Sequence, residues 1–416
     1  MNRPPLPTVL AYGAWLKNAA CLLVGDQPTW SDVHGDLSDP AACDALKASV
    51  ALMLKAQGAA VSAVAHDLHP DFFSTQLAVQ LAAELGVPAI GVQHHHAHMA
   101  AVLAEYAVDG PAIGLMLDGV GLGTDGTAWG GELLWMAGAH VGVDGRANGS
   151  ANFDAKADVN GDASWQRLGH LVPLALPGGD RAAREPWRMA ASALHALGRN
   201  ADITPRFAPV VGESLAAGVQ QMLARGLNCP TTSSAGRWFD AAAGALGISV
   251  RQADEAEAAI GLERAAARGL AQHPAMTPLP GATVDAHNRL DLLGLVPHLL
   301  AAHASAHADQ DAAAAGFHLA LADALAQWAE TAARQHGCTV VCLGGGCFAN
   351  RILRERVTAR LQSAGLAVLS PRVNSCGDAG LALGQAWVAQ RRLQRPLMHP
   401  APHSPLPLIK EPEPCV

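Results

Sequence analysis

The chain has 416 residues, of which 50% are hydrophobic and only 15% charged, and its formal net charge is −8. This composition predicts a large buried core in about two or three domains and excludes a mostly disordered protein. Its five lysines are scattered and form no basic block, so nucleic-acid binding is disfavoured as the main activity.

The two ends of the chain and its cysteines indicate the cellular location. The Pro-rich start does not resemble a signal peptide and no run of about 20 apolar residues occurs, so we expect a cytoplasmic protein without membrane contact. The eight cysteines include no Cys-x-x-Cys pair, which favours reduced thiols over a disulfide framework or a zinc ribbon. Residues 396–416 contain seven prolines and are expected to form an extended, mobile tail.

The first 140 residues alternate between short apolar runs and stretches with helical spacing. Strands are expected at 8–12, 20–25, 61–65, 88–92 and 112–117, and helices at 41–57, 72–85 and 95–106. The strand at 112–117 should break at Asp118, and residues 127–136 should form a bent strand pair. Alternation of this kind predicts a mainly parallel sheet with helices on both faces.

The second half begins with a Gly-, Asp-, Asn- and Ser-rich stretch and continues with Ala-rich helices. The expected elements are a long connection at 140–179, helices over 181–335, strands at 339–343 and 367–370, and helices over 349–364 and after Gly380. The same order of strand, glycine turn and helix at both ends of the chain predicts two α/β lobes with a cleft between them. The expected division is an N-terminal lobe at 1–140, a connection with a helix-rich region at 141–335, and the rest of the C-terminal lobe at 336–395.

A histidine-rich run from Gln93 to His98 follows the strand expected at 88–92. If both are helical, His94 and His98 lie one turn apart on one face, where two imidazoles can reach one divalent ion. The alternative is a helix start whose rings cap backbone groups or face the solvent. Four histidines at the mouth of an expected cleft favour metal or phosphate chemistry.

Asp118 and Asp378 are the candidate carboxylates for such an ion. Asp118 closes an apolar strand at its carboxyl end, where α/β folds place ligands, although it can equally cap a turn. Asp378 precedes the last helix. It either caps that helix, which is the ordinary role, or projects into the cleft opposite His94 and His98.

The turn from Gly344 to Gly346 leads from a strand into a helix and can aim N–H groups at a phosphate or a sugar. It lacks the Lys-Ser/Thr pair of a P-loop and the spacing of a dinucleotide fingerprint. A plain tight turn therefore explains it equally well.

Two polar runs stay open from the sequence alone. The run from His66 to Asp71 follows a strand and forms either part of a site or a capped turn. The run from Arg184 to Arg188 either binds a carboxylate or phosphate or holds a buried ion pair around Trp187.

Taken together, these runs resemble the carboxy-terminal carbamoyltransferase region of the HypF family, which serves nickel–iron hydrogenase maturation. The similarity covers about residues 8–395, in the same order along the chain. The runs that carry it are Gly13-Ala14-Trp15-Leu16-Lys17-Asn18, His66-Asp67-Leu68-His69-Pro70-Asp71, Gln93-His94-His95-His96-Ala97-His98, Asp118-Gly119-Val120-Gly121, Arg184-Glu185-Pro186-Trp187-Arg188, Ser234-Ala235-Gly236-Arg237-Trp238-Phe239-Asp240, Gly344-Gly345-Gly346 and Asp378-Ala379-Gly380.

The resemblance implies an actin-like, hexokinase-type ATPase fold of the α/β class, with two lobes, a cleft between them and a helix-rich insertion. TobZ-type O-carbamoyltransferases and TsaD threonylcarbamoyl transferases share this fold, and in them a divalent metal lies beside a bound adenylate. The implied metal ligands, which are also the implied catalytic residues, are His94, His98, Asp118 and Asp378. The implied nucleotide contacts are Lys17, Asp240, Gly344, Gly345, Gly346 and Asn350.

The resemblance also implies an activity, the transfer of a carbamoyl group from carbamoyl-adenylate to the C-terminal cysteine thiol of the partner HypE. Imidazoles combined with carboxylates suit iron, zinc or manganese, and Mg²⁺ can accompany the nucleotide. A cation bridging the phosphate and carbonyl oxygens of the donor would make AMP the leaving group.

The sequence also departs from the family. Full-length HypF has an acylphosphatase-like domain, two zinc motifs and a YrdC-like domain that makes the adenylate, and this sequence has none of them, so a separate YrdC-like protein is expected to supply the donor. Residues 377–380 read Gly-Asp-Ala-Gly in place of Asn-Asp-Gly-Gly, and residues 254–257 read Asp-Glu-Ala-Glu in place of Tyr-Glu-Gly-Gln. The alternatives are an O-carbamoyltransferase of a small molecule and a non-catalytic protein that binds HypE or a nucleotide.

Overall fold

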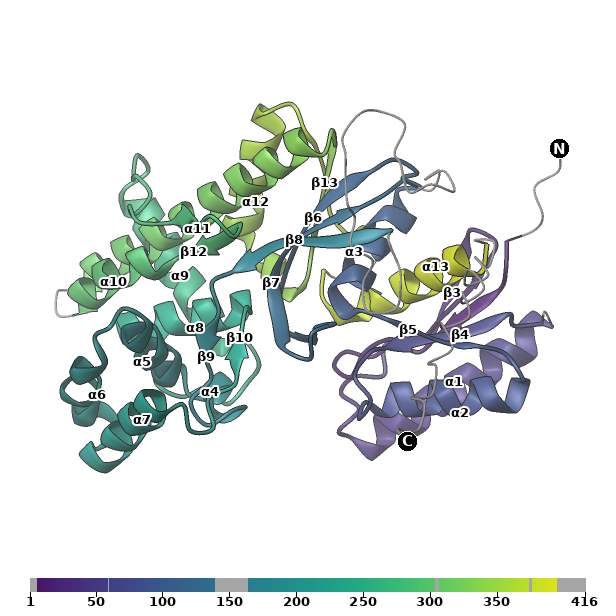
Figure 1. Ribbon diagram of the computed structural model, residues 1–416, viewed down its shortest axis with the longest axis horizontal. Helices are drawn as coiled ribbons and strands as arrows, with labels where there is room; N and C mark the ends of the chain where they lie inside the picture. The colour runs from purple at the N-terminus through teal and green to yellow at the C-terminus, as the bar shows by residue number, and fades with distance from the viewer. Residues whose placement is uncertain (1–5, 59, 139–163, 304–306, 374–375, 395–416) are drawn as a thin grey trace, which may run out of the picture.

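The computed structural model describes residues 6–58, 60–138, 164–303, 307–373 and 376–394. Within them, two β-sheets are separated and flanked by helices (Figure 1). The tail expected at 396–416 and the start of the connection expected at 140–179 lie outside the described residues. Among the described residues, no helix is long and apolar enough to cross a membrane.

The first sheet is formed by the N-terminal strands β1 (Val9–Ala11), β2 (Cys21–Val24), β3 (Gln27–Trp30), β4 (Ala63–Asp67) and β5 (Ala89–Val92). Their order is β3-β2-β1-β4-β5. The strands β1, β4 and β5 run parallel, whereas β2 and β3 are antiparallel to their neighbours. The sheet is therefore mixed.

Helices cover both faces of this sheet because successive side chains of a strand point to opposite faces. Leu10 and Val64 share a core with α1 and α2, and Val9 and Ala65 share a core with α13. The helices concerned are α1 (Pro40–Gln57), α2 (Phe73–Leu85) and α13 (Leu381–Gln394). The C-terminal helix thus packs against the N-terminal sheet.

Local signals define α1 as the sequence predicts. The Asp39 carboxylate accepts a hydrogen bond from the Ala41 N–H (2.9 Å), and Pro40 occupies the first turn, where its missing N–H costs nothing. Gly58 ends the helix with φ 58°, a left-handed conformation that glycine adopts without strain.

The second sheet has the order β11-β12-β8-β7-β6-β13-β14; the short strand β10 pairs with β7, and β9 pairs with β10. Antiparallel pairing joins β6, β7 and β8, whereas β13 runs parallel to both β6 and β14. The strands are β6 (Ala112–Leu122), β7 (Ala128–Met136), β8 (Trp165–Leu171), β9 (Leu174–Ala175), β10 (Thr231–Thr232), β11 (Thr283–Val284), β12 (Arg289–Asp291), β13 (Val340–Gly344) and β14 (Ala367–Leu369).

Several sequence predictions for this sheet were wrong. A mainly parallel sheet was expected, but both sheets are mixed. The strands β8 and β9 lie in the expected connection, and β10, β11 and β12 interrupt the expected run of helices. Residues 128–136 form one strand rather than a pair. Each error has the same cause, because long-range pairing overrides a weak local pattern.

The strand β6 does not break at Asp118, as the glycines after it suggested, but continues to Leu122. Its pairing with β7 changes register between Leu117 and Gly121, so Asp118 lies in an irregular part of the strand. Such irregularities bend a strand and redirect side chains. Asp118 therefore lies in the part of β6 where the regular pairing with β7 is interrupted.

Two helices lie between the two sheets, α13 and α3 (His94–Glu105) (Figure 1). The helix α13 packs on α3 and on the first sheet, and α3 packs on β6 and β13 of the second sheet. The two helices approach closely at Gly384, where an added Cβ would lie 1.8 Å from the Ala97 carbonyl oxygen. The N-terminal ends of this layer carry the candidate site.

The other face of the second sheet packs against the helix-rich part of the chain. Leu115 and Leu343 of the sheet share one core with Trp238 and Phe317 of these helices. The helices are α4 (Arg181–Arg184), α5 (Pro186–Ala196), α6 (Ile203–Val211), α7 (Glu213–Arg225), α8 (Ala235–Leu246), α9 (Glu257–Gln272), α10 (Val296–His303), α11 (His307–Gln335) and α12 (Arg351–Ser363). The division of the chain at 140 and 335 stays a prediction.

Candidate metal centre

The helix α3 places two imidazoles on one face. Gln93 caps the helix, since its side-chain oxygen accepts the His96 N–H (2.8 Å), so the helix begins at His94 rather than at His95 as predicted. His94 and His98 are consequently one turn apart, and their ring centroids are separated by 4.9 Å.

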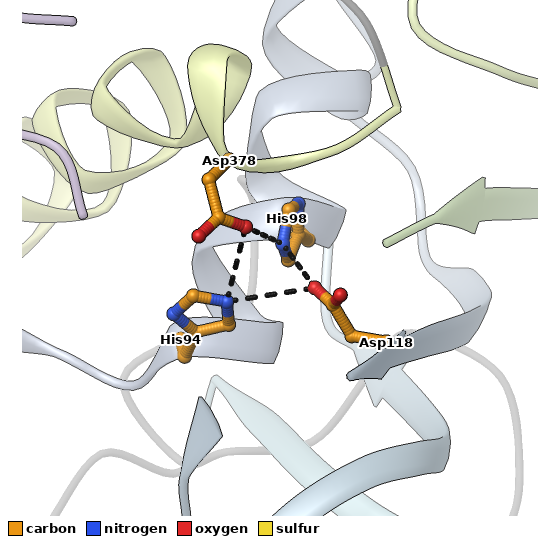
Figure 2. A group of neighbouring side chains, drawn as sticks. All are labelled: His94, His98, Asp118 and Asp378. Atoms are coloured by element: carbon orange, nitrogen blue, oxygen red, sulfur yellow. Dashed lines mark ion pairs between the residues drawn. The ribbon is translucent and has the colours of Figure 1, made fainter. Parts of the chain in front are cut away.

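Two carboxylates from distant parts of the sequence meet these rings. Asp118 comes from β6, and Asp378 comes from the short 3-10 turn η4 (Asp378–Gly380) that precedes α13. Figure 2 shows all four side chains pointing toward one another, and one ligand atom from each lies within 4.8 Å of the others. The Asp378 carboxylate faces His94 and His98, so it projects toward the imidazoles, which is one of the two roles that the sequence left open for it.

The distances suit a shared cation. His98 Nε2 lies 3.0 Å from Asp118 Oδ2 and 3.5 Å from Asp378 Oδ1, and His94 Nε2 lies 3.6 Å from each of the same oxygens. Both Nε2 atoms and Asp118 Oδ2 are buried and face one another as ion pairs, but no hydrogen bond satisfies them among the described residues. Buried polar atoms without partners are rare in native structures, and a metal ion is one explanation. The donor set therefore fits a divalent cation.

The charges in this cluster balance each other. Burial alone would lower the pKa of His94, but the Asp378 charge and the contacts with Asp118 and Asp67 raise that pKa well above its usual range. The pKa of His98 is also raised, against burial, by Asp118 and Asp378. Despite burial, both rings in turn lower the pKa values of Asp118 and Asp378. A cation that replaced the Nε2 protons would preserve this balance.

Asp67 was not among the site residues predicted from the sequence. It ends β4, is fully buried, and its Oδ2 lies 2.8 Å from Nδ1 of His94. The position of Asp67 at the end of a strand could have indicated its role. The strands β4 and β5 are parallel, and Asp67 pairs in register with Val92, two residues before His94. Polar residues at the carboxyl ends of adjacent parallel strands meet at one edge of the sheet. The run from His66 to Asp71 is therefore a capped turn that also reaches the centre.

The glycine turn after β13 touches the strand of Asp118. The Gly346 N–H donates to Asp118 Oδ1 (3.3 Å), and the Gly345 N–H donates to the Cys376 carbonyl oxygen (2.9 Å). Gly345 has φ 91°, and an added Cβ there would lie 2.3 Å from the Leu117 carbonyl oxygen. Two of the N–H groups expected to face a ligand thus have protein partners, and one of them orients Asp118.

The other expected nucleotide contacts have partners within the protein. The Lys17 ammonium lies 3.0 Å from Glu255, and Asp240 is buried 2.8 Å from Arg237, with its pKa raised by burial to about 6. The Asn350 side chain caps α12 and contacts His318 (2.9 Å). Of these residues, only Lys17 is largely exposed. Partial burial lowers the pKa of Lys17, but Glu255 and then the charges of Asp378 and Asp118 outweigh this effect and raise it. These nucleotide contacts stay predictions.

The open question about the run from Arg184 to Arg188 is answered by a buried ion pair. Glu185 Oε2 accepts hydrogen bonds from Arg188 (2.5 Å) and from the Trp187 indole (3.2 Å). Arg188 and Glu185 are both buried. This run therefore forms a satisfied ion pair around Trp187, and removing one partner would leave a buried charge unpaired.

This arrangement defines a class of protein. An α/β fold with two mixed sheets brings together two imidazoles and a carboxylate from the ends of its inner helices and a carboxylate from β6, beside a glycine turn. Mixed nitrogen and oxygen donors of this kind suit zinc, iron or manganese, and glycine turns suit anionic ligands. Such a centre can hold a cation next to a phosphate-containing molecule.

Comparison with known proteins identifies the family. Residues 4–105 match the family described as "HypF Kae1-like domain", and residues 157–385 match "Carbamoyltransferase, Kae1-like Domain, second subdomain". The chain is 57% identical to the "Carbamoyltransferase HypF homolog" of Cupriavidus necator over 92% of both chains. It is 46% identical to "Carbamoyltransferase HypF2" of the same organism, over 93% of this chain and 47% of that protein. The chain therefore belongs to the HypF carbamoyltransferase family, as the resemblance predicted.

A solved structure supports the same conclusion for the fold. Full-length HypF in a phosphate- and nucleotide-bound form superposes with a TM-score of 0.78 at 27% identity, covering 94% of this chain and 47% of that one. The expected class of two-lobed α/β fold is thereby confirmed. The chain spans about half the length of HypF2 and of this HypF, but nearly all of the HypF homolog.

Proposed function

We propose that this chain transfers a carbamoyl group from carbamoyl-adenylate to the C-terminal cysteine thiol of a HypE-like protein in nickel–iron hydrogenase maturation. Family membership supports the reaction class, since the relatives are named carbamoyltransferases. The observation that carries the proposal is the convergence of His94, His98, Asp118 and Asp378 beside the glycine turn.

In this proposal His94, His98, Asp118 and Asp378 hold a divalent cation, with iron, zinc and manganese as candidates and Mg²⁺ on the nucleotide. The buried Nε2 atoms, which no hydrogen bond satisfies among the described residues, support this assignment. The cation would act as a Lewis acid toward the phosphate and carbonyl oxygens of the donor.

The residues of the chain bind and orient the reactants. The Gly344–Gly346 turn lets the nucleotide approach the backbone, and the Gly346 N–H fixes the Asp118 carboxylate. Lys17, an exposed ammonium whose pKa is raised in part by the charges of Asp378 and Asp118, would contact a phosphate after leaving Glu255. The partner's thiolate sulfur forms a bond to the carbamoyl carbon while the C–O bond to the phosphate breaks, and AMP leaves with the electron pair.

The donor comes from a separate YrdC-like protein in this proposal. The test combines the purified chain with such an enzyme, carbamoyl phosphate, ATP and a HypE-like protein, and follows the mass of the HypE-like protein. We expect a gain of one carbamoyl group, which is lost when the C-terminal cysteine of the partner is replaced by alanine.

Three results would contradict this proposal. No mass gain with intact nucleotide binding would favour the non-catalytic alternative. Transfer to a sugar hydroxyl instead would favour the O-carbamoyltransferase alternative. Undiminished transfer by His98→Ala would show that the proposed centre does not serve the reaction.

A further inference from the structure

A buried carboxylate outside the proposed ligand set fixes one of the two imidazoles. Asp67 Oδ2 lies 2.8 Å from Nδ1 of His94, and Asp67 Oδ1 accepts the backbone N–H of His69 (3.0 Å). The Asp67 side chain is fully buried, and the His94 side chain retains 3% exposure. Both oxygens of this carboxylate are therefore committed to donors within the protein.

This contact decides which nitrogen of His94 carries a hydrogen. An ionised carboxylate has no hydrogen to donate, so the hydrogen between the two groups belongs to Nδ1 of His94. The remaining nitrogen, Nε2, faces Asp118 and Asp378, and its lone pair becomes available to a cation that replaces the Nε2 proton there. A metal-ligating histidine commonly donates its other N–H in this way, which fixes both tautomer and ring orientation.

Packing against the opposite edge of the His94 ring also restricts the orientation of that ring. A Cβ added at Gly121 would lie 2.7 Å from Cδ2 of His94 and 2.8 Å from its Cβ. The backbone of β6 thus closes against the ring that Asp67 holds by its Nδ1.

We propose that Asp67 is the positioning residue of the metal centre, which sets the His94 tautomer so that Nε2 is available to the cation. The inference rests on the metal-binding part of the proposed function and is independent of the acceptor. Asp67 itself touches neither the cation nor the substrate.

Replacing Asp67 by asparagine tests the tautomer directly. The His69 N–H still requires an acceptor, so the amide oxygen of Asp67→Asn stays on that side and its NH₂ group faces His94. Nδ1 then becomes the acceptor, and the proton moves to Nε2, where it opposes a cation. We expect the affinity for Co²⁺, titrated through its visible absorption, to fall about 10- to 100-fold, with an altered spectrum.

The comparison with Asp67→Ala separates this role from a purely structural one. Alanine removes the acceptor but leaves both tautomers open, so Asp67→Ala should bind Co²⁺ more tightly than Asp67→Asn. A purely structural role predicts the reverse order, because asparagine preserves the shape of the side chain and alanine leaves a cavity. Asp71→Asn, an exposed carboxylate in the same loop, is the matched control and should bind like the unchanged chain.

A measurement on the unchanged chain keeps the proposal testable if the Asp67 variants fail to fold. Nitrogen-15 NMR of the Zn²⁺-loaded protein should show a proton on Nδ1 of His94 and none on Nε2. A proton on Nε2, equal Co²⁺ affinity in Asp67→Asn and Asp71→Asn, or no binding of Co²⁺ or Zn²⁺ by the unchanged chain would overturn the inference. A failed carbamoyl transfer by a chain that binds Co²⁺ would count against the proposed function alone.

Discussion

Two regions of the molecule meet at the candidate metal centre, and they are built differently. On one side, Asp67 ends the regular strand β4, and His94 follows the regular strand β5 in a capped helix. On the other side, Asp118 lies where β6 changes register, and the turn after β13 needs a left-handed glycine at Gly345. Regular strand pairing positions Asp67 and His94. An irregular strand and the close approach of the Gly345 turn to the backbone of β6 position Asp118.

The difference shows how each side holds its groups in position. The side of the first sheet depends on the register of β4 and β5, which are joined through one helix, and on the Gln93 cap, which is local. The side of the second sheet depends on contacts between distant segments, such as the Gly346 N–H with Asp118. Asp378 belongs to neither sheet and arrives with α13, which joins the two regions.

The largest expected effect comes from separating the two regions at the contact between α3 and α13. Gly384→Ala places a methyl group 1.8 Å from the Ala97 carbonyl oxygen, so the helices must move apart. We expect a loss of about 3 kcal/mol in the free energy of unfolding, measured in guanidinium, together with weaker metal binding.

The control for this change is Gly218→Ala in α7, where an added Cβ meets no atom within 4 Å. Since alanine favours a helix over glycine, this variant should be stabilised by about 0.5–1 kcal/mol. A Gly384→Ala protein as stable as the unchanged chain would show that the close contact does not limit the approach of the helices.

The next effect concerns stabilisation by metal. A cation that binds only the folded chain should raise its free energy of unfolding by about 2.7 kcal/mol at 100 times the dissociation constant. His98→Ala should abolish this gain and lower bound metal severalfold while leaving the metal-free fold intact. Calorimetry with and without Zn²⁺ measures it, with the exposed His287→Ala as control. A Zn²⁺ gain that survives in His98→Ala would remove His98 from the ligand set.

A smaller effect tests the second-sheet side through pH. Burial lowers the pKa of His318 to about 4, and its neutral ring accepts a hydrogen bond from the Asn350 side-chain amide at the start of α12. In the unfolded chain, His318 takes up a proton at its ordinary pKa, whereas the folded chain resists protonation. The contribution of the neutral His318 to the free energy of unfolding is therefore fully present above about pH 6.5 and is lost as the pH falls toward 4. Between pH 7.5 and 5.5 we expect a loss of about 1 kcal/mol that His318→Gln removes. Equal pH slopes for the two proteins would contradict this.

The smallest effect concerns the ion pair between Lys17 and Glu255, which bridges the two regions at the surface. Their side chains are 56% and 60% exposed, and exposed pairs contribute about 0–1 kcal/mol. A double-mutant cycle with Lys17→Ala and Glu255→Ala should therefore give a coupling energy below about 1 kcal/mol. A clearly larger coupling would show that surface charge, rather than the buried layer of α3 and α13, ties the regions together.

Local sequence signals predicted much of the first side. The Asp39 and Gly58 signals define α1, and the spacing of His94 and His98 predicted two imidazoles on one helix face. The family resemblance named Asp118 and Asp378 as their partners, and the structure brings all four together. The role of each as a metal ligand stays a prediction.

The second side was predicted less well because its geometry depends on distant segments. The glycines after Asp118 suggested a strand end, but pairing with β7 carries β6 on to Leu122. The strand β8 was hidden in a polar stretch because its pairing partners, β7 and β12, supply the order that its own pattern lacks.

The sequence by itself determined the alternation of strands and helices, the imidazole pair and the family. Tertiary structure alone decided that α13 packs between the sheets, that Asp378 faces His94, and that Asp67 binds the far side of that ring. The physical reason is the range of the interactions. Caps and helical spacing act within a few residues, whereas a cluster of buried charges forms only where packing brings remote segments together.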